Sequence, residues 1–126
     1  MIRAAEIRRT ERVEAAKAAN LRGADLSDAH LSRANLSGAD LTEAKLNVAL
    51  LSEAILFEVT LIGADLSRTN LCGANLTGAN LTGANLTGAD LSLTNLVETD
   101  LTDADPTCRG LSISRVRRCR RSDELR

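Results

Sequence analysis

Aromatic residues, proline and histidine are scarce in this chain, and their scarcity excludes several classes of protein. The 126 residues include one Phe, one Pro and one His, but no Trp and no Tyr. Because aromatic side chains normally supply much of a globular core, we do not expect such a core here. No stretch approaches the roughly 20 apolar residues that span a bilayer, and the charged N-terminus does not resemble a secretory signal. We therefore predict a cytoplasmic protein that makes no membrane contact.

The few cysteines and the single histidine do not form a recognisable metal or catalytic set. Cys72, Cys108 and Cys119 are odd in number and lack C-x-x-C spacing, which favours structural thiols over a zinc site. His30 is alone, whereas an activated nucleophile needs a base and an orienting acid beside it. The glycines are isolated from one another, so no phosphate-binding loop is present. We predict a protein that is not an enzyme and has no cofactor.

Leucine, in contrast, is abundant and recurs at a fixed interval. It stands at every fifth position from Leu21 to Leu101, which makes seventeen leucines in succession. In a helix, five residues advance a side chain by about 140°, so the leucines would spread over every face. In a flat strand, an odd step would send successive leucines to opposite faces. The chain must therefore bend once per repeat to return each leucine to the inside.

The positions around each leucine repeat as well. Alanine usually stands two residues before the leucine and should share its inward face, while Asp or Asn usually stands between them and points outward. Ser or Thr often follows the leucine, and the next residue is often glycine, which tolerates the positive φ of a tight corner. Where another residue replaces that glycine, we expect a turn that tolerates a side chain. The predicted core includes Leu26, Leu46, Leu66, Leu86, Ala24, Ala44, Ala64 and Ala84.

The units ADLSD at 24–28 and ANLTG at 74–78 resemble the A-(D/N)-L-x-x unit of the pentapeptide-repeat family. The resemblance covers about 19–105 and implies an all-β fold, a right-handed quadrilateral β-helix with four repeats in each coil. Seventeen repeats would then make just over four coils, about 20 Å long at about 4.8 Å between stacked strands. The resemblance also implies a structural or protein-interaction role.

The net charge of −1 conceals three zones of different charge. Residues 1–18 have five basic and three acidic residues (net +2), residues 19–105 have four and twelve (net −8), and residues 106–126 have seven and two (net +5). We predict that the first zone is a short helix that caps the open end of the repeat domain formed by the second. Pro106 stands where a leucine is due and Arg109 stands at an inward position, so the coil should stop near Asp105. The third zone is then a basic tail.

The basic tail is a candidate anion-binding segment. One hypothesis is that it is solvated or lies on the acidic rod of its own chain; the other is that it contacts nucleic-acid phosphates. It contains no interleaved aromatic residues and no recognised nucleic-acid motif, which makes the second hypothesis weakly supported. The candidate residues are Arg115, Arg117, Arg118, Arg120 and Arg121.

If each coil takes twenty residues, residues twenty apart in the sequence lie above one another. This predicts a column of Asp25, Lys45 and Asp65, and it places Arg33 under Glu53. Exposed ion pairs contribute only about 0–1 kcal/mol each, so we interpret both groups as structural.

Large apolar residues interrupt the outward positions in the middle of the repeat domain. Clustered apolar residues on a soluble rod often mark a contact surface, although a terminal segment of the chain could equally cover them. The candidate partner patch consists of Val48, Leu50, Ile55, Phe57, Ile62 and Val97.

The leading functional hypothesis is a non-enzymatic module, a rigid acidic rod that binds a protein partner. End-to-end stacking of rods into a homodimer is one form that such binding could take. A second hypothesis is a DNA mimic that binds a type II topoisomerase, as some pentapeptide-repeat proteins do; the acidic rod fits this role, but the short rod, the absence of central phenylalanines and the arginine-rich tail oppose it. The third is nucleic-acid contact through the tail.

Overall fold

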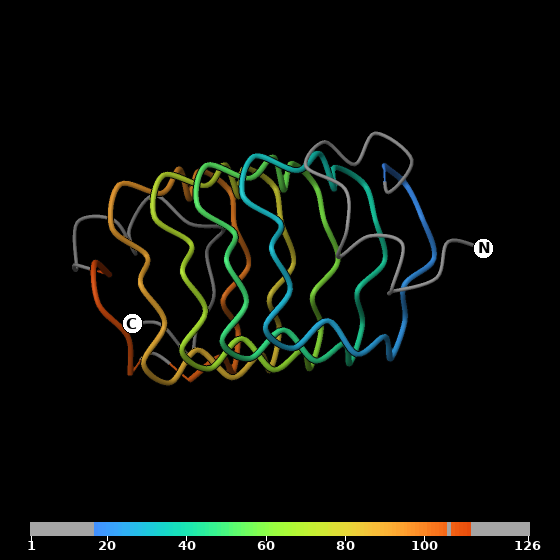
Figure 1. The fold of residues 1–126 in the computed structure, drawn as a ribbon. Coiled ribbons are helices and arrows are strands. Elements are labelled where there is room, and N and C mark those ends of the chain that lie inside the picture. Colours follow the sequence, from blue (N-terminus) through green and yellow to red (C-terminus); the bar gives the residue numbers. More distant parts are fainter. Residues whose placement is uncertain (1–16, 106, 112–126) are drawn as a thin grey trace.

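The computed structural model describes residues 17–105 and 107–111, and over these residues the chain winds into a stack of coils (Figure 1). Parallel bridges join residues twenty apart, from Asn20–Asp40 to Asn85–Asp105, so each coil takes twenty residues. The described residues contain no α-helix and no continuous β-strand, because the chain turns a corner every five residues and leaves one bridged residue on each of four sides. Accordingly, no helix in this part of the chain is long and apolar enough to cross a membrane.

The backbone ladder bonds each coil to both of its neighbours. The N–H of Asp65 donates to the carbonyl of Ala44 in the preceding coil at 3.0 Å, and the N–H of Leu66 donates to the carbonyl of Asn85 in the following coil at 2.8 Å. Backbone groups buried between coils are thereby paired. A coil without neighbours would leave the same groups without partners, so the coils stabilise one another.

The residue two positions after each leucine turns the corner with a positive φ. The φ angle is 74° at Gly73, 54° at Glu58 and 56° at Arg68. Corners with and without glycine thus share one left-handed geometry, and at the non-glycine corners this is the turn that tolerates a side chain. The left-handed conformation costs a non-glycine residue on the order of 1 kcal/mol. The stacked coils impose it, because the corner N–H must reach the carbonyl of the next coil.

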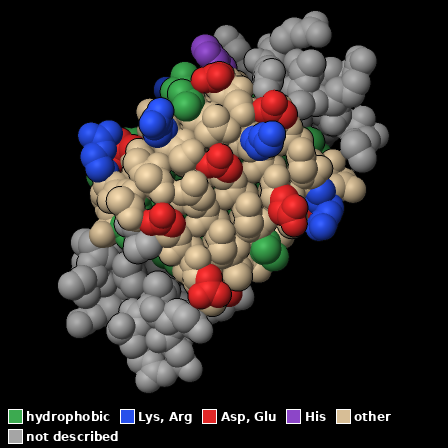
Figure 2. Space-filling view, turned by 90° about the horizontal axis from the view of Figure 1, so that it is seen from below, with side chains coloured by type: hydrophobic (Ala, Val, Ile, Leu, Met, Phe, Trp, Pro, Cys, Tyr) green, Lys and Arg blue, Asp and Glu red, His purple; other side chains and the backbone are tan. Residues whose placement is uncertain are grey.

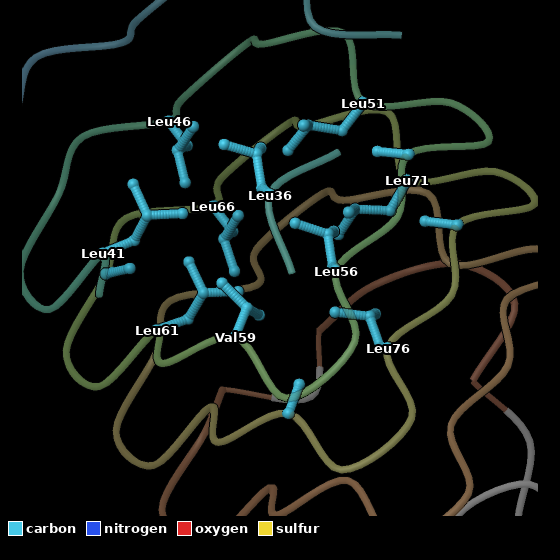
Figure 3. Packing of buried hydrophobic residues seen from close by; sticks show 14 of the residues in the cluster. Leu36, Leu41, Leu46, Leu51, Leu56, Val59, Leu61, Leu66, Leu71 and Leu76 are labelled. Atoms are coloured by element: carbon cyan, nitrogen blue, oxygen red, sulfur yellow. The ribbon is translucent and has the colours of Figure 1, made fainter. Parts of the chain in front are cut away.

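The lumen of the coil is filled by leucine side chains that point inward from all four sides (Figure 3). Leu46, Leu66 and their equivalents in the other coils are completely or almost completely buried. The alanines beside them are buried too, except Ala19 and Ala24 at one end of the stack and Ala104 at the other, which are half-buried. The other predicted core residues are fully buried. Their exposed fractions are Leu26 0%, Leu46 0%, Leu66 0%, Leu86 0%, Ala44 0%, Ala64 0% and Ala84 1%.

Three threonines occupy inward positions that are usually alanine, and backbone carbonyls accept hydrogen bonds from their hydroxyls. The hydroxyl of Thr69 donates to the carbonyl of Leu46 at 2.7 Å, and that of Thr99 donates to the carbonyl of Leu76 at 2.7 Å. Thr94 donates to a leucine carbonyl of its own coil. Among the described residues, no buried side-chain nitrogen or oxygen lacks a hydrogen-bond partner, so these substitutions leave no unsatisfied polar group in the lumen.

The outward Asp and Asn side chains brace the corners. In most repeats, the side-chain oxygen of the residue directly before the leucine accepts a hydrogen bond from the N–H of the residue directly after the leucine. We call this arrangement a cap. The Asp40 carboxylate accepts from the N–H of Thr42 at 3.1 Å and from its hydroxyl at 2.6 Å. The cap explains why Asp or Asn precedes the leucine and why Ser or Thr so often follows it.

The caps that use aspartate also perturb the acidity of that side chain. The Thr42 hydroxyl and N–H, with the nearby Arg22 guanidinium, hold the pKa of Asp40 below its ordinary value. The hydroxyl and N–H of Ser92 lower the pKa of Asp90 in the same way. Each bond favours the ionised carboxylate, because an anion accepts a hydrogen bond more strongly than a neutral acid does.

The ladder extends beyond Asp105, the point at which we had expected it to stop. Asp90 is bridged to Arg109, nineteen residues later rather than twenty, so the register shifts by one residue in the last turn. As a result Cys108 packs against the core, while Arg109 lies outside with its guanidinium 3.4 Å from the Asp90 carboxylate. The shift avoids the high cost of placing an unpaired arginine in an apolar lumen.

At the other end, Lys17 and Ala18 already belong to the coil. Ala18 has φ 57° and its N–H donates to the carbonyl of Ser37, so this residue forms a corner rather than the end of the predicted helix. The rest of that helix, at 1–16, and the tail beyond Leu111 lie outside the described residues.

The leucine column is testable by removing one member of it. We expect Leu66→Ala to lower the free energy of unfolding by about 2–5 kcal/mol, because it opens a cavity in a filled lumen. The matched control is Leu93→Ala, the same chemical change at a leucine that is 82% exposed, which should alter stability by less than about 0.5 kcal/mol. Urea unfolding of the two variants measures the difference, and equal effects would contradict the inward placement of Leu66.

The aspartate caps predict a particular dependence of stability on pH. A carboxyl whose pKa is lowered in the folded state stabilises the fold above its unfolded pKa of about 4 and loses that contribution as the pH falls toward the lowered value. Asp40→Asn keeps an amide oxygen as the acceptor but cannot titrate. We therefore expect the wild type to lose more stability than Asp40→Asn when urea unfolding is compared at pH 6 and pH 3. Equal losses would show that the cap does not favour the ionised form.

Candidate functional site

The four walls of the rod differ in what they present to solvent. We name each wall after its first leucine, as the Leu21, Leu26, Leu31 and Leu36 walls, and each continues through the leucines twenty residues apart. The residues directly before and after a leucine lie on the wall, and the second residue after the leucine lies at the corner. Because the lumen is filled, any functional site of the described coils must lie on these walls, corners or ends.

The candidate partner patch is divided among the walls. Ile55, Phe57 and Val97 lie on the Leu36 wall, whereas Leu50 lies on the Leu31 wall and Ile62 on the Leu21 wall. On the face shown in Figure 2, hydrophobic side chains are scattered singly among polar and charged ones. The structure therefore places five of the six predicted residues in one coil, as a belt around the rod. The exposed fractions are Val48 43%, Leu50 39%, Ile55 42%, Phe57 43%, Ile62 38% and Val97 43%.

One exposed apolar residue was not predicted from the sequence. Leu93 lies at the corner between the Leu31 and Leu36 walls and is the most exposed large hydrophobic residue described. Its φ of 61° is left-handed, so it carries the strain of the corner without gaining from burial. A signal was present in the sequence: apart from Val48, Leu93 is the one large apolar residue at a corner position between 21 and 105.

The coil that carries the belt also lacks the caps. Lys45, Leu50, Ile55 and Thr60 stand where Asp or Asn forms the cap in most other repeats. Among the described residues, no acceptor receives a hydrogen bond from the N–H groups that these side chains would have capped, which belong to Asn47, Ser52, Phe57 and Ile62. Elsewhere in the described repeats, only the one with His30 lacks a cap. We call residues 45–63 the uncapped coil.

Apolar side chains and uncapped N–H groups therefore coincide on one coil. Exposed N–H groups bond to water or to an acceptor supplied by another molecule. A surface with apolar contacts and a few unfilled polar groups is typical of binding sites.

From Asn35 to Val97 the Leu36 wall has no charged residue; the one described charge on it is Lys17, one coil before Ser37 at the N-terminal end. The other outward residues are Asn35, Ser37, Ile55, Phe57, Asn75, Thr77, Asn95 and Val97. The other walls bear charges, including the Arg22–Asp40 pair at 3.3 Å on the Leu21 wall and the Arg109–Asp90 pair at 3.4 Å on the Leu31 wall.

The corners on either side of the Leu36 wall do carry charge. On one side Arg33 pairs with Glu53 at 3.2 Å, which confirms the predicted stacking of these two residues. On the other side the corner column contains Glu58 and Glu98, and neither forms an ion pair with a described residue. From Asn35 to Val97 the wall is thus an uncharged surface with two carboxylates along one edge.

The remaining candidate groups do not assemble into a reactive site in the part of the chain that the structure describes. His30 is exposed and bridged to Leu50, as the twenty-residue stacking predicted. Cys72 and Cys108 are half-buried, and Cys72 is a free thiol. No three His, Cys, Asp or Glu side chains of the described residues are close enough together to hold a metal ion. The candidate anion-binding arginines, Arg115, Arg117, Arg118, Arg120 and Arg121, lie outside these residues and stay a prediction.

Comparison with known proteins agrees with this architecture. The family model described as pentapeptide repeats matches residues 19–56 and 54–92. A pentapeptide repeat protein from Nostoc PCC 7120 is 31% identical over 88% of this chain and 87% of its own, with a TM-score of 0.71. Another, from the Arabidopsis thaliana thylakoid lumen, is 33% identical over 72% of this chain and 70% of its own, with a TM-score of 0.51. No curated protein matches the chain significantly. From the family match and these two structures, we conclude that the chain belongs to the pentapeptide-repeat family.

Proposed function

We propose that this chain is a non-enzymatic binding module that holds a partner protein against its outer surface. The observation that carries the proposal is the uncapped coil. A cap supplies a hydrogen bond to an exposed N–H, and thirteen described repeats have one. In the uncapped coil, four consecutive repeats lack caps, and five large apolar side chains are exposed instead.

Replacing caps with exposed apolar side chains does not stabilise the isolated rod. A cap is a local hydrogen bond, and such bonds contribute about 0.5–1.5 kcal/mol each. Apolar side chains that remain about 40% exposed contribute only part of the stabilising free energy that complete burial would give. The same side chains become favourable when a partner covers them, which is the reason that clustered exposed apolar residues mark contact surfaces.

The shape of the rod supports binding rather than catalysis. Its lumen is occupied by fully buried leucines, which leaves no interior space in which a substrate could be enclosed. In the described residues no hydrogen bond joins His30 to a carboxylate or hydroxyl that would make it a general base. The walls provide a rigid surface, and rigid surfaces lose little entropy when they bind.

The topoisomerase hypothesis stays a prediction without structural support. The fluoroquinolone resistance protein QnrB1 matches with 19% identity and a TM-score of 0.26, which is too distant to carry an argument about function. Three of the arginines among the described residues also pair with acids on the rod, which breaks the acidic surface that DNA mimicry requires.

The test is to remove the apolar side chains without disturbing the coil. We expect Ile55→Ser/Phe57→Ser to abolish recovery of a specific partner when the tagged protein is purified from its native cells. Because both side chains lie outside the lumen and are only partly buried, the free energy of unfolding should fall by no more than about 1–2 kcal/mol for each substitution, which leaves the coil folded.

The matched control is Lys45→Ser/Asn47→Ser, which alters the same coil on the opposite, Leu26 wall. It should leave the recovered partner unchanged. Recovery of the same proteins in equal amounts with both double variants would reject the uncapped coil as the contact surface.

A further inference from the structure

Among the described residues, four of the seven exposed large hydrophobic side chains gather on one side of the rod. Ile55 and Phe57 lie on the Leu36 wall in one coil, and Val97 lies on the same wall two coils further on. Leu93 lies at the edge of the wall in the coil of Val97. With coils about 4.8 Å apart, the two apolar rows are about 10 Å from each other.

The row between them is made of small and polar residues. It runs from the corner at Gly73 through Asn75 and Thr77 to the corner at Gly78. Both corner glycines lack a side chain, so neither end of this row is blocked by one. A separation of about 10 Å between apolar rows is about twice the spacing of neighbouring strands, so one extended chain can lie over the row between them.

A hydrogen-bond donor lies beside this row. The N–H of Phe57 has no cap and no acceptor among the described residues. An extended chain has free backbone carbonyls along its whole length, whereas the interior carbonyls of a helix are already bonded. The donor therefore favours an extended partner segment over a helical one.

The acidic residues along one edge of the wall favour a positively charged partner. Glu58 and Glu98 occupy the same corner column two coils apart, with Gly78 between them, and neither pairs with a described cation. The repeat domain as a whole has a net charge of −8 over residues 19–105. A second copy of the chain would bring two such domains together against their repulsion, whereas a basic segment would be attracted.

Building on the proposed function, we propose that the Leu36 wall binds an extended basic segment of a partner protein. The segment lies across the wall between the two apolar rows, with its apolar side chains against Ile55, Phe57 and Val97. Its Lys or Arg side chains lie against Glu58 and Glu98. Apolar contact supplies the affinity, and the charged edge supplies selectivity and orientation.

The test uses two synthetic peptides and the full-length protein. One peptide alternates leucine and lysine over eight residues, and the other replaces each leucine with serine while keeping the lysines. Fluorescence anisotropy measures the Kd of each labelled peptide. We expect the leucine–lysine peptide to bind at least about tenfold more tightly than the serine–lysine peptide, because only the former can use the apolar rows.

Two double variants separate the apolar contribution from the charged one. Ile55→Ser/Phe57→Ser should weaken the leucine–lysine peptide by at least about tenfold, and Glu58→Gln/Glu98→Gln should weaken it and flatten its dependence on salt. The matched control is Glu43→Gln/Asp103→Asn, which removes two charges from the next corner column. This control should change the Kd by less than about twofold.

Several results would overturn the proposal. Equal binding of the two peptides would indicate general attraction to an acidic rod. So would a loss of affinity in the control variant equal to that in Glu58→Gln/Glu98→Gln. Methyl chemical-shift changes away from Ile55, Leu93 and Val97 would place the peptide elsewhere. Nuclear Overhauser contacts in the free protein between these methyls and a residue beyond Leu111 would show that the wall is occupied by its own chain. If the native partner still depends on Ile55 and Phe57 while neither peptide binds, the proposed function stands and the inferred partner chemistry fails.

Discussion

The rest of the structure depends on a single packing constraint, which is that one leucine from every five residues must reach the centre of the coil. Leu66 and its equivalents are buried, and a left-handed corner follows each of them. That corner returns the chain to the centre and aims its N–H at the next coil, so packing in the lumen and pairing in the ladder impose the same geometry. Since neither is complete in a single coil, stability is a property of the stack.

The same constraint moves all variable chemistry to the outside. A residue before or after the leucine can form a cap, an ion pair or an apolar contact without altering the backbone, as Asp40, Arg22 and Ile55 do in turn. The surface can therefore change over one coil while the coils above and below keep every cap except the one at His30. We interpret the uncapped coil as such a change, in which local stabilisation is exchanged for the capacity to bind.

Much of the architecture was predictable from the five-residue period. The period assigns Leu66 to the inside and Ile55 to the outside, and the twenty-residue coil correctly stacks Arg33 with Glu53. The inward and outward assignments follow from spacing alone, because every repeat occupies an equivalent position, whereas the twenty-residue coil was implied by the resemblance to the pentapeptide-repeat family.

Features that depend on backbone conformation were not predictable in this way. The exposed Leu93 was missed because a leucine at a strained corner opposes local preference, and only the stacked neighbours hold it there. The outward position of Arg109 requires a one-residue shift of register that the period itself argues against. The caps went unrecognised because they join residues two apart through a side chain, whereas the sequence shows only that Asp or Asn and Ser or Thr recur.

Residue-resolved amide hydrogen exchange of the free protein tests the central claim most directly, because it reports the ladder one N–H at a time. The account predicts that the amide of Leu66 and those of the other leucines in the stack exchange slowly. The amides of Ser52, Phe57 and Ile62 should exchange rapidly between slowly exchanging neighbours, at the five-residue interval. Uniform protection through the uncapped coil, or fast exchange of the leucine amides, would contradict it.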